Sequence, residues 1–231
     1  MRRYLVVDDN AAFADNLAEI LRDTGAEAVT ATGGRLALQL AGKQRFDALI
    51  TDMRMPSMNG AALVHEMLRL DPGLPAIVVT AYTGEDDLAA ARYEGLLAVL
   101  PKPVPIGQLL ALLAVARRDG LVALVDDNIP FSELVAETLS QHGFSAVLVH
   151  SVVETDRLGS VRPFAALVDL CMPGSPDGEA LRMLQRRFPQ LPVFRMTGHP
   201  EIVPNGIFVF AKPLNTAHVL TALESAYENR K

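Results

Sequence analysis

The chain alternates short apolar runs with longer stretches in which apolar residues recur every three or four positions. In the first half the apolar runs lie at residues 3–7, 27–30, 48–52, 76–80 and 97–100. The helical period is clearest between the first two runs, at Phe13, Leu17, Ile20 and Leu21. Continuous apolar strands that alternate with helices predict a parallel sheet covered on both faces. The first half is therefore predicted to be a doubly wound, five-stranded α/β domain of the flavodoxin-like class.

The second half repeats the landmarks of the first half in the same order. Asp8-Asp9, Asp52, Thr80 and Lys102 are matched by Asp126-Asp127, Asp169, Thr197 and Lys212. The neighbouring residues also agree, as in LVVDDN at 5–10 and ALVDDN at 123–128. This agreement indicates two copies of one domain in tandem, at residues 1–118 and 119–231.

The second copy is shorter between its fourth and fifth strands. The lysines of the two copies are 110 residues apart, whereas the earlier landmarks are 117 or 118 residues apart. The stretch GHPEIVPNG at 198–206 contains two prolines and a glycine near its end, which is typical of a loop. We therefore expect the fourth helix of copy two to be lost or reduced to a turn. The linker ARRDG at 116–120 is short, so the two domains are expected to be coupled geometrically.

Composition narrows the class of protein. A chain of 231 residues, half of them hydrophobic, fits two globular domains. It has no apolar run of about 18 residues and no signal-peptide core, which predicts a cytoplasmic protein that does not bind membranes. The net charge is −6, and both halves are acidic, which argues against a nucleic-acid partner. Cys171 is the only cysteine, so a disulfide within the chain is excluded, and we expect a small packed residue beside Asp169.

The repeated polar residues lie where strands end. The carboxyl ends of parallel strands meet at one edge of the sheet, where doubly wound domains bind ligands. A single aspartate there is usually a helix cap or a solvated loop residue, but five landmarks repeated in order favour a shared pocket. Three carboxylates at one edge repel one another unless a cation binds. Oxygen ligands without histidine or cysteine favour Mg²⁺ or Mn²⁺ over zinc.

The same residues can support phosphoryl chemistry. A carboxylate beside a metal ion can attack phosphorus, because the metal neutralises the phosphoryl oxygens as the bond forms. Thr80 offers a hydroxyl group and Lys102 an ammonium group to the remaining oxygens. The set predicts a site at which a carboxylate forms an acyl phosphate.

With these landmarks in strand context, both halves resemble receiver domains of two-component response regulators. The resemblance rests on the DD, D-x-x-M-P, T and K-P motifs and covers nearly the whole chain. It implies that Asp52 and Asp169 accept a phosphoryl group from a sensor histidine kinase or a histidine phosphotransfer protein. It implies direct metal ligation by Asp9, Asp127, Asp52 and Asp169, water-mediated ligation by Asp8 and Asp126, and ligation by the backbone carbonyls of Arg54 and Cys171. It also implies cis peptide bonds at Lys102-Pro103 and Lys212-Pro213.

One position departs from the family pattern in both copies. The family usually places Tyr or Phe three residues before the lysine, where the ring moves inward as the threonine engages phosphate. Here those positions are Val99 and Val209. The switch must therefore use other residues, or the output differs from the usual one.

The last helix of copy one carries more apolar residues than one face needs. Within residues 106–118, Leu112 and Val115 lie well around the helix from the core stripe. A helix that is apolar on two sides usually buries both, so we expect contact with copy two or with a second protomer in a homodimer. This helix is also expected to cover the apolar surface left at 207–210 by the missing helix of copy two. The residues at 219–231 form a last helix, and we expect no output domain after it.

Three functions fit these observations. The first is a stand-alone tandem-receiver response regulator of a phosphorelay, with output through protein contacts or phosphate flow. The second is a mainly non-phosphorylated interaction scaffold in which one copy is a pseudo-receiver. The third is an aspartate-nucleophile phosphatase of the haloacid dehalogenase type, which expects D-x-D at the nucleophile. Asp52 is followed by Met53-Arg54 and Asp169 by Leu170-Cys171, so the sequence disfavours an enzyme of this class.

Overall fold

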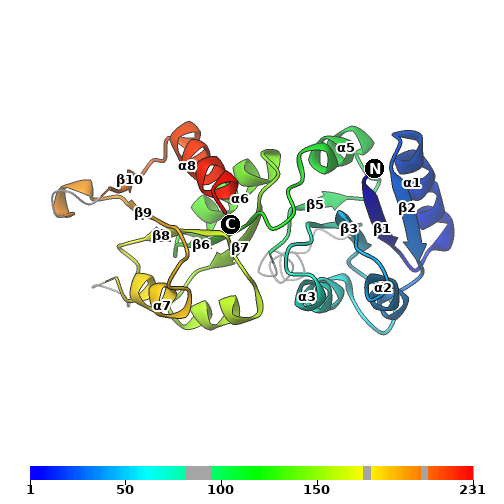
Figure 1. The fold of residues 1–231 in the computed structure, drawn as a ribbon, viewed down its shortest axis with the longest axis horizontal. Helices are drawn as coiled ribbons and strands as arrows, with labels where there is room; N and C mark the ends of the chain where they lie inside the picture. Colours follow the sequence, from blue (N-terminus) through cyan, green and yellow to red (C-terminus); the bar gives the residue numbers. More distant parts are fainter. Residues whose placement is uncertain (82–94, 174–177, 204–207, 231) are drawn as a thin grey trace.

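The computed structural model describes residues 1–81, 95–173, 178–203 and 208–230, and these residues form two α/β lobes side by side (Figure 1). Each lobe contains a parallel sheet of five strands. The strand orders are β2-β1-β3-β4-β5 and β7-β6-β8-β9-β10, so the second sheet repeats the topology of the first. The predicted fold, two doubly wound domains in tandem, is confirmed.

In copy one the strands lie within one residue of their predicted bounds. They are β1 (Arg3–Val7), β2 (Glu27–Ala31), β3 (Ala48–Asp52), β4 (Ala76–Thr80) and β5 (Ala98–Pro101). The described helices are α1 (Ala11–Asp23), α2 (Gly34–Ala41), α3 (Gly60–Leu70) and α5 (Ile106–Val115). The fourth helix expected between β4 and β5 falls on residues 82–94, which lie outside the described residues.

In copy two the strands are β6 (Leu121–Val125), β7 (Ser145–Val149), β8 (Ala165–Asp169), β9 (Val193–Thr197) and β10 (Phe210–Ala211). The α-helices are α6 (Ile129–Gln141), α7 (Glu179–Arg187) and α8 (Thr216–Glu228). A 3₁₀ helix, η1 (Val153–Ser160), takes the place of the second helix. Between β9 and β10 the described residues form only the short 3₁₀ helix η2 (Pro200–Ile202), as the shortened sequence predicts.

Each sheet is covered by helices on both faces because its strands are apolar on both faces. In β1, Leu5 and Val7 pack into a cluster with α2 and α3, whereas Tyr4 and Val6 pack into a cluster with α1 and α5. This alternation follows from the two-residue period of a strand. Both faces of these strands are thus buried, and this packing fixes the positions of the strand ends. Among the described residues, no helix is long and apolar enough to cross a membrane.

Both copies begin and end their first helix in the same way. The side chains of Asn10 and Asn128 cap α1 and α6 by accepting hydrogen bonds from the backbone N–H groups of Phe13 and Phe131, each at 3.1 Å. Gly25 and Gly143 follow these helices with φ angles of 85° and 82°. A glycine adopts this left-handed conformation without steric cost, so it stops the helix and turns the chain into the next strand.

The two domains meet along one edge of each sheet. Helix α5 contacts α6, and the backbone N–H of Ala146 in β7 donates a hydrogen bond of 3.3 Å to the carbonyl oxygen of Leu96, just before β5. The predicted contact between α5 and copy two is therefore present. Its location differs from our expectation, because β10 lies at the opposite edge of the second sheet (Figure 1). Helix α5 does not cover that edge, and Phe208 is 70% exposed.

The linker is held by both domains. The guanidinium group of Arg117 donates to the carbonyl oxygen of His142 at 3.0 Å and lies over the ring of Phe144 in copy two. The next residue, Arg118, donates to both carboxylate oxygens of Asp71 in copy one, at 2.5 and 2.6 Å. The hydroxyl group of Tyr227 donates to the carbonyl oxygen of Arg118 at 2.8 Å. Arg117 thus binds the linker to copy two, and Arg118 binds it to copy one.

Leu112 and Val115, the two residues of α5 that lie outside its predicted core stripe, differ in burial. Leu112 is 6% exposed, whereas Val115 is 40% exposed. We expect Leu112→Ala to lower the free energy of unfolding by about 2–4 kcal/mol, because it leaves a cavity in the core. Val115→Ala should change the free energy of unfolding by less than about 0.5 kcal/mol. Urea unfolding followed by circular dichroism measures both, and equal losses would contradict the burial seen here.

Candidate functional site

In copy one the predicted site residues converge at the carboxyl edge of the first sheet. The carboxylates of Asp8, Asp9 and Asp52 each place an oxygen within 4.8 Å of the other two. The ammonium group of Lys102 lies 2.6 Å from Asp8 Oδ2 and 3.1 Å from Asp52 Oδ2. Thr80 ends β4 and is 1% exposed. The structure thus brings together acids that are more than 40 residues apart in sequence.

A close backbone approach sets the position of the Asp52 loop. The N–H of Gly60, the first residue of α3, donates a hydrogen bond of 2.8 Å to the carbonyl oxygen of Met53. A Cβ atom at Gly60 would lie 2.3 Å from the carbonyl oxygen of Asp52. Only glycine permits this approach, which holds the β3 end against α3. Arg54, whose backbone carbonyl is a predicted metal ligand, lies in this loop two residues after β3.

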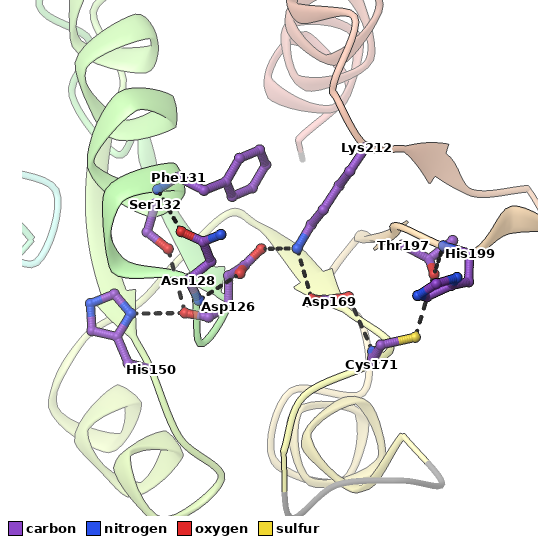
Figure 2. Close-up of polar contacts among 10 residues, drawn as sticks. All are labelled: Asp126, Asn128, Phe131, Ser132, His150, Asp169, Cys171, Thr197, His199 and Lys212. Carbon is purple, nitrogen blue, oxygen red and sulfur yellow. Dashed lines mark hydrogen bonds and ion pairs between the residues drawn. The ribbon is translucent and has the colours of Figure 1, made fainter.

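Copy two builds the same constellation from its own strand ends (Figure 2). The carboxylates of Asp126, Asp127 and Asp169 again place oxygens within 4.8 Å of one another. Lys212 Nζ lies 2.6 Å from Asp126 Oδ2 and 2.7 Å from Asp169 Oδ2. Thr197 ends β9 and is fully buried. The predicted cis peptide bonds before Pro103 and Pro213 are both present.

The two lysines approach their carboxylates at different distances. In copy one, Lys102 donates a hydrogen bond to Asp8 and lies farther from Asp52. In copy two, Lys212 Nζ lies equally close to both acids, at 2.6 Å from Asp126 Oδ2 and 2.7 Å from Asp169 Oδ2. Asp126 is fully buried, so its charge depends on this one shared lysine.

Charge is unbalanced in both pockets. Burial opposes the charge of Lys102, but hydrogen bonds and attraction from Asp8 and Asp52 outweigh it and raise the pKa of this lysine. The pKa of Lys212 is raised in the same way by Asp126 and Asp169. Burial raises the pKa of Asp126, and Lys212 offsets only part of that effect. Each pocket thus has three carboxylates and one ammonium group, which leaves an excess of negative charge when all are ionised.

A divalent cation fits this donor set. The clusters offer carboxylate oxygens and no nitrogen or sulfur ligand, which suits a hard cation such as Mg²⁺. Buried Asp126 shares its one lysine with Asp169, so a divalent cation would add the positive charge that this pair lacks. Asp8, Asp9 and Asp52 would hold the ion in copy one, and Asp126, Asp127 and Asp169 would hold it in copy two.

The rings of Phe13 and Phe131 belong to the two sites, although the sequence assigned Phe13 only to the apolar stripe of its helix. Lys102 Nζ lies 4.4 Å from the ring centroid of Phe13, and Lys212 Nζ lies 4.7 Å from that of Phe131. A ring face attracts an ammonium group, so each phenylalanine helps to orient its lysine. The repeat could have revealed this role, because each ring follows the second acid of its pair by four residues.

Cys171 lies beside the acceptor position of copy two, but it is not packed as we expected. Its backbone N–H donates to Asp169 Oδ1 at 3.1 Å, and its thiol lies 3.5 Å from the hydroxyl oxygen of Thr197 (Figure 2). The residue is exposed. The expectation of a packed residue is therefore wrong, because Cys171 follows the end of β8 and lies outside the sheet.

Comparison with known proteins assigns the family. Residues 4–114 match the model of the response regulator receiver domain. Over 232 aligned residues, which cover all of this chain and 97% of the relative, the chain is 58% identical to the response regulator receiver protein Anae109_2439 of Anaeromyxobacter sp. (strain Fw109-5). The chain belongs to the response regulator receiver family.

Other proteins are similar to about half of this chain. The transcriptional regulatory protein ZraR of Escherichia coli (strain K12) is 36% identical over 47% of this chain, which corresponds to 25% of ZraR. The solved chemotaxis protein CheY4 of Vibrio cholerae is 32% identical, with a TM-score of 0.47 over 49% of this chain and 97% of CheY4.

Asp9 tests the metal site with little risk to the fold, because its side chain is exposed. We expect Asp9→Ala to weaken Mg²⁺ binding strongly, since it removes a carboxylate that is predicted to bind the ion directly. The melting temperature of the apo protein should not fall, because repulsion among the acids is relieved. Titration calorimetry with Mg²⁺ measures the first effect. Asp15→Ala, which removes an exposed acid of α1 outside the pocket, is the matched control, and equal Mg²⁺ affinity in both variants would contradict the assignment.

Proposed function

We propose that this protein is a tandem-receiver response regulator that accepts a phosphoryl group on Asp52, and also on Asp169, from a sensor histidine kinase or a histidine phosphotransfer protein. The observation that carries the proposal is the repeated pocket, in which an acid triad, a lysine and a buried threonine meet at one sheet edge. Membership of the receiver family supports it. We place the protein in the cytoplasm, with output through protein contacts or phosphate flow.

Asp52, Lys102 and Thr80 have different roles in the transfer of the phosphoryl group. A carboxylate oxygen of Asp52 attacks phosphorus, and the bond from phosphorus to the donor's histidine nitrogen breaks with its electron pair left on that nitrogen. A bound Mg²⁺ would neutralise charge on the phosphoryl oxygens. Lys102 is already 3.1 Å from Asp52, so it can hold one of these oxygens after a small movement. Thr80 lies at the end of the adjacent strand β4 and can donate its hydroxyl to another.

This role is that of a phosphoryl acceptor rather than of an enzyme. A phosphatase of the aspartate-nucleophile type needs a second carboxylate two residues after the nucleophile. Arg54 and Cys171 occupy those positions. The scaffold alternative differs from our proposal in one measurable respect, because a pseudo-receiver does not form an acyl phosphate.

Labelling of the intact protein tests the proposal. Acetyl phosphate can replace the kinase because the acceptor domain supplies the catalytic residues. With Mg²⁺ we expect a mass increase of one or two phosphoryl groups, lost on chelation of the metal. Hydroxylamine should remove the label, since it cleaves acyl phosphates but not phosphate esters. A chain that stays unlabelled while a known receiver is labelled in the same tube would support the scaffold instead.

A further inference from the structure

A groove of about 760 Å³ runs between the two domains. Its floor is formed by the facing edges of the two sheets, at residues 96–99 and at Ala146 and Leu148. Its walls are α5 of copy one and α6 of copy two. This groove is distinct from the acid pockets, because none of the predicted metal or phosphoryl residues lines it.

The internal repeat indicates that the leucine of the α6 wall is not needed for its helix to form. Leu134 lines the groove and is 63% exposed. The equivalent position of copy one, on a helix with the same cap and the same length, is Asn16. A receiver helix therefore folds with a polar residue here, whereas copy two has a leucine at this position, beside the groove.

The α5 wall belongs to copy one, and it too has apolar residues where the equivalent helix of the other copy has polar residues. Val115 lines the groove at 40% exposure, and the equivalent residue of α8 in copy two is Ser225. Ala111 likewise corresponds to Thr221. Both walls are thus more apolar than their counterparts, and Leu134 and Val115 remain exposed after the domains have packed together. Exposed apolar residues that gather in one groove are typical of an interaction site.

Charge indicates what kind of partner fits. Glu133 and Glu137 lie one turn apart on α6, and no lysine, arginine or histidine is among the described residues that line the groove. A second copy of this chain would bring its own net charge of −6 to an acidic wall. A helix with an apolar face and basic flanks would instead pack on Leu134 and bring the opposite charge to Glu137.

We propose that this groove binds a basic amphipathic helix of a partner protein. The apolar face of that helix lies over Leu134 and Val115, and its lysine or arginine side chains approach Glu137. The groove thereby provides a place at which both receiver domains contact one partner, because one wall comes from each domain.

A synthetic helical peptide of leucine and lysine, with its leucines on one face, can serve as the probe. Fluorescence anisotropy of this labelled peptide is measured with the full chain at physiological salt. We expect Leu134→Asn and Glu137→Gln each to weaken binding about five- to tenfold, the loss expected for one apolar contact or one close charge pair. Because both side chains are exposed, the melting temperatures should stay unchanged.

Matched controls separate the groove from general attraction to an acidic protein. Leu70→Asn removes a leucine of α3 that is 59% exposed, and Glu19→Gln removes the equivalent glutamate of copy one. Both controls should bind like wild type. Equal losses in the controls, equal binding of a leucine and glutamate peptide, or a dimer in sedimentation that Leu134→Asn dissociates would overturn the proposal.

Discussion

Asp52→Asn is expected to remove all labelling from copy one, because an amide is too weak a nucleophile toward phosphorus. If both copies accept a phosphoryl group, total labelling should fall to about half, and the remainder should disappear in the double variant with Asp169→Asn. The measurement is the mass of the intact protein after incubation with acetyl phosphate and Mg²⁺. The two single variants then assign each added phosphoryl group to its domain.

The structure gives a reason to expect faster labelling of copy one. The side chain of Asp52 is 12% exposed, and its Oδ2 lies 3.1 Å from Lys102 Nζ. Asp169 is 7% exposed, and its Oδ2 accepts a hydrogen bond of 2.7 Å from Lys212 Nζ. Attack by Asp169 must therefore displace a lysine that lies closer. Asp127→Asn and Asp9→Asn keep the size of the metal ligands and serve as controls, since each should affect only its own copy. Unchanged labelling in Asp52→Asn would refute the acceptor assignment.

The acid pockets could be predicted from sequence because their residues occupy strand ends. Once the apolar runs define parallel strands, Asp8, Asp52 and Thr80 must share one edge of the sheet, whatever the loops do. The repeat then placed Asp126 and Asp169 by the same argument. How closely each lysine approaches each carboxylate could not be predicted, because those distances differ by only a few tenths of an ångström.

The contact between domains was predictable only in part. Apolar residues on the second side of α5 indicate that this side is covered. They do not indicate which element covers it, because the hydrophobic effect is not directional and any apolar surface can serve. We assigned the cover to the β10 edge, whereas the linker arginines hold α5 against α6. The 3₁₀ helix η1 was also missed, because the sequence VETDRLGS lacks the apolar period by which helices are recognised.

Lys212→Met is expected to lower the stability of the apo protein strongly at neutral pH. The substitution keeps most of the side-chain volume but leaves Asp126, which is fully buried, and Asp169 without their shared cation. Breaking a buried ion pair costs about 3–5 kcal/mol, and we expect about 3 kcal/mol here because Lys212 is 18% exposed. Urea unfolding in the presence of a chelator measures the loss.

The same experiment with Mg²⁺ tests whether the cluster is a metal site. A divalent cation that binds the folded state restores positive charge between the two carboxylates, so part of the lost stability should return as Mg²⁺ is added. Lys102→Met, whose lysine is 21% exposed and whose Asp52 is less buried than Asp169, should lose less stability than Lys212→Met. Lys43→Met, at an exposed position away from both pockets, should lose none. If Lys212→Met loses no more stability than Lys43→Met, the uncompensated charge of Asp126 is relieved by water. In that case the charge argument for a cation in copy two fails, whereas the labelling of Asp52 is unaffected.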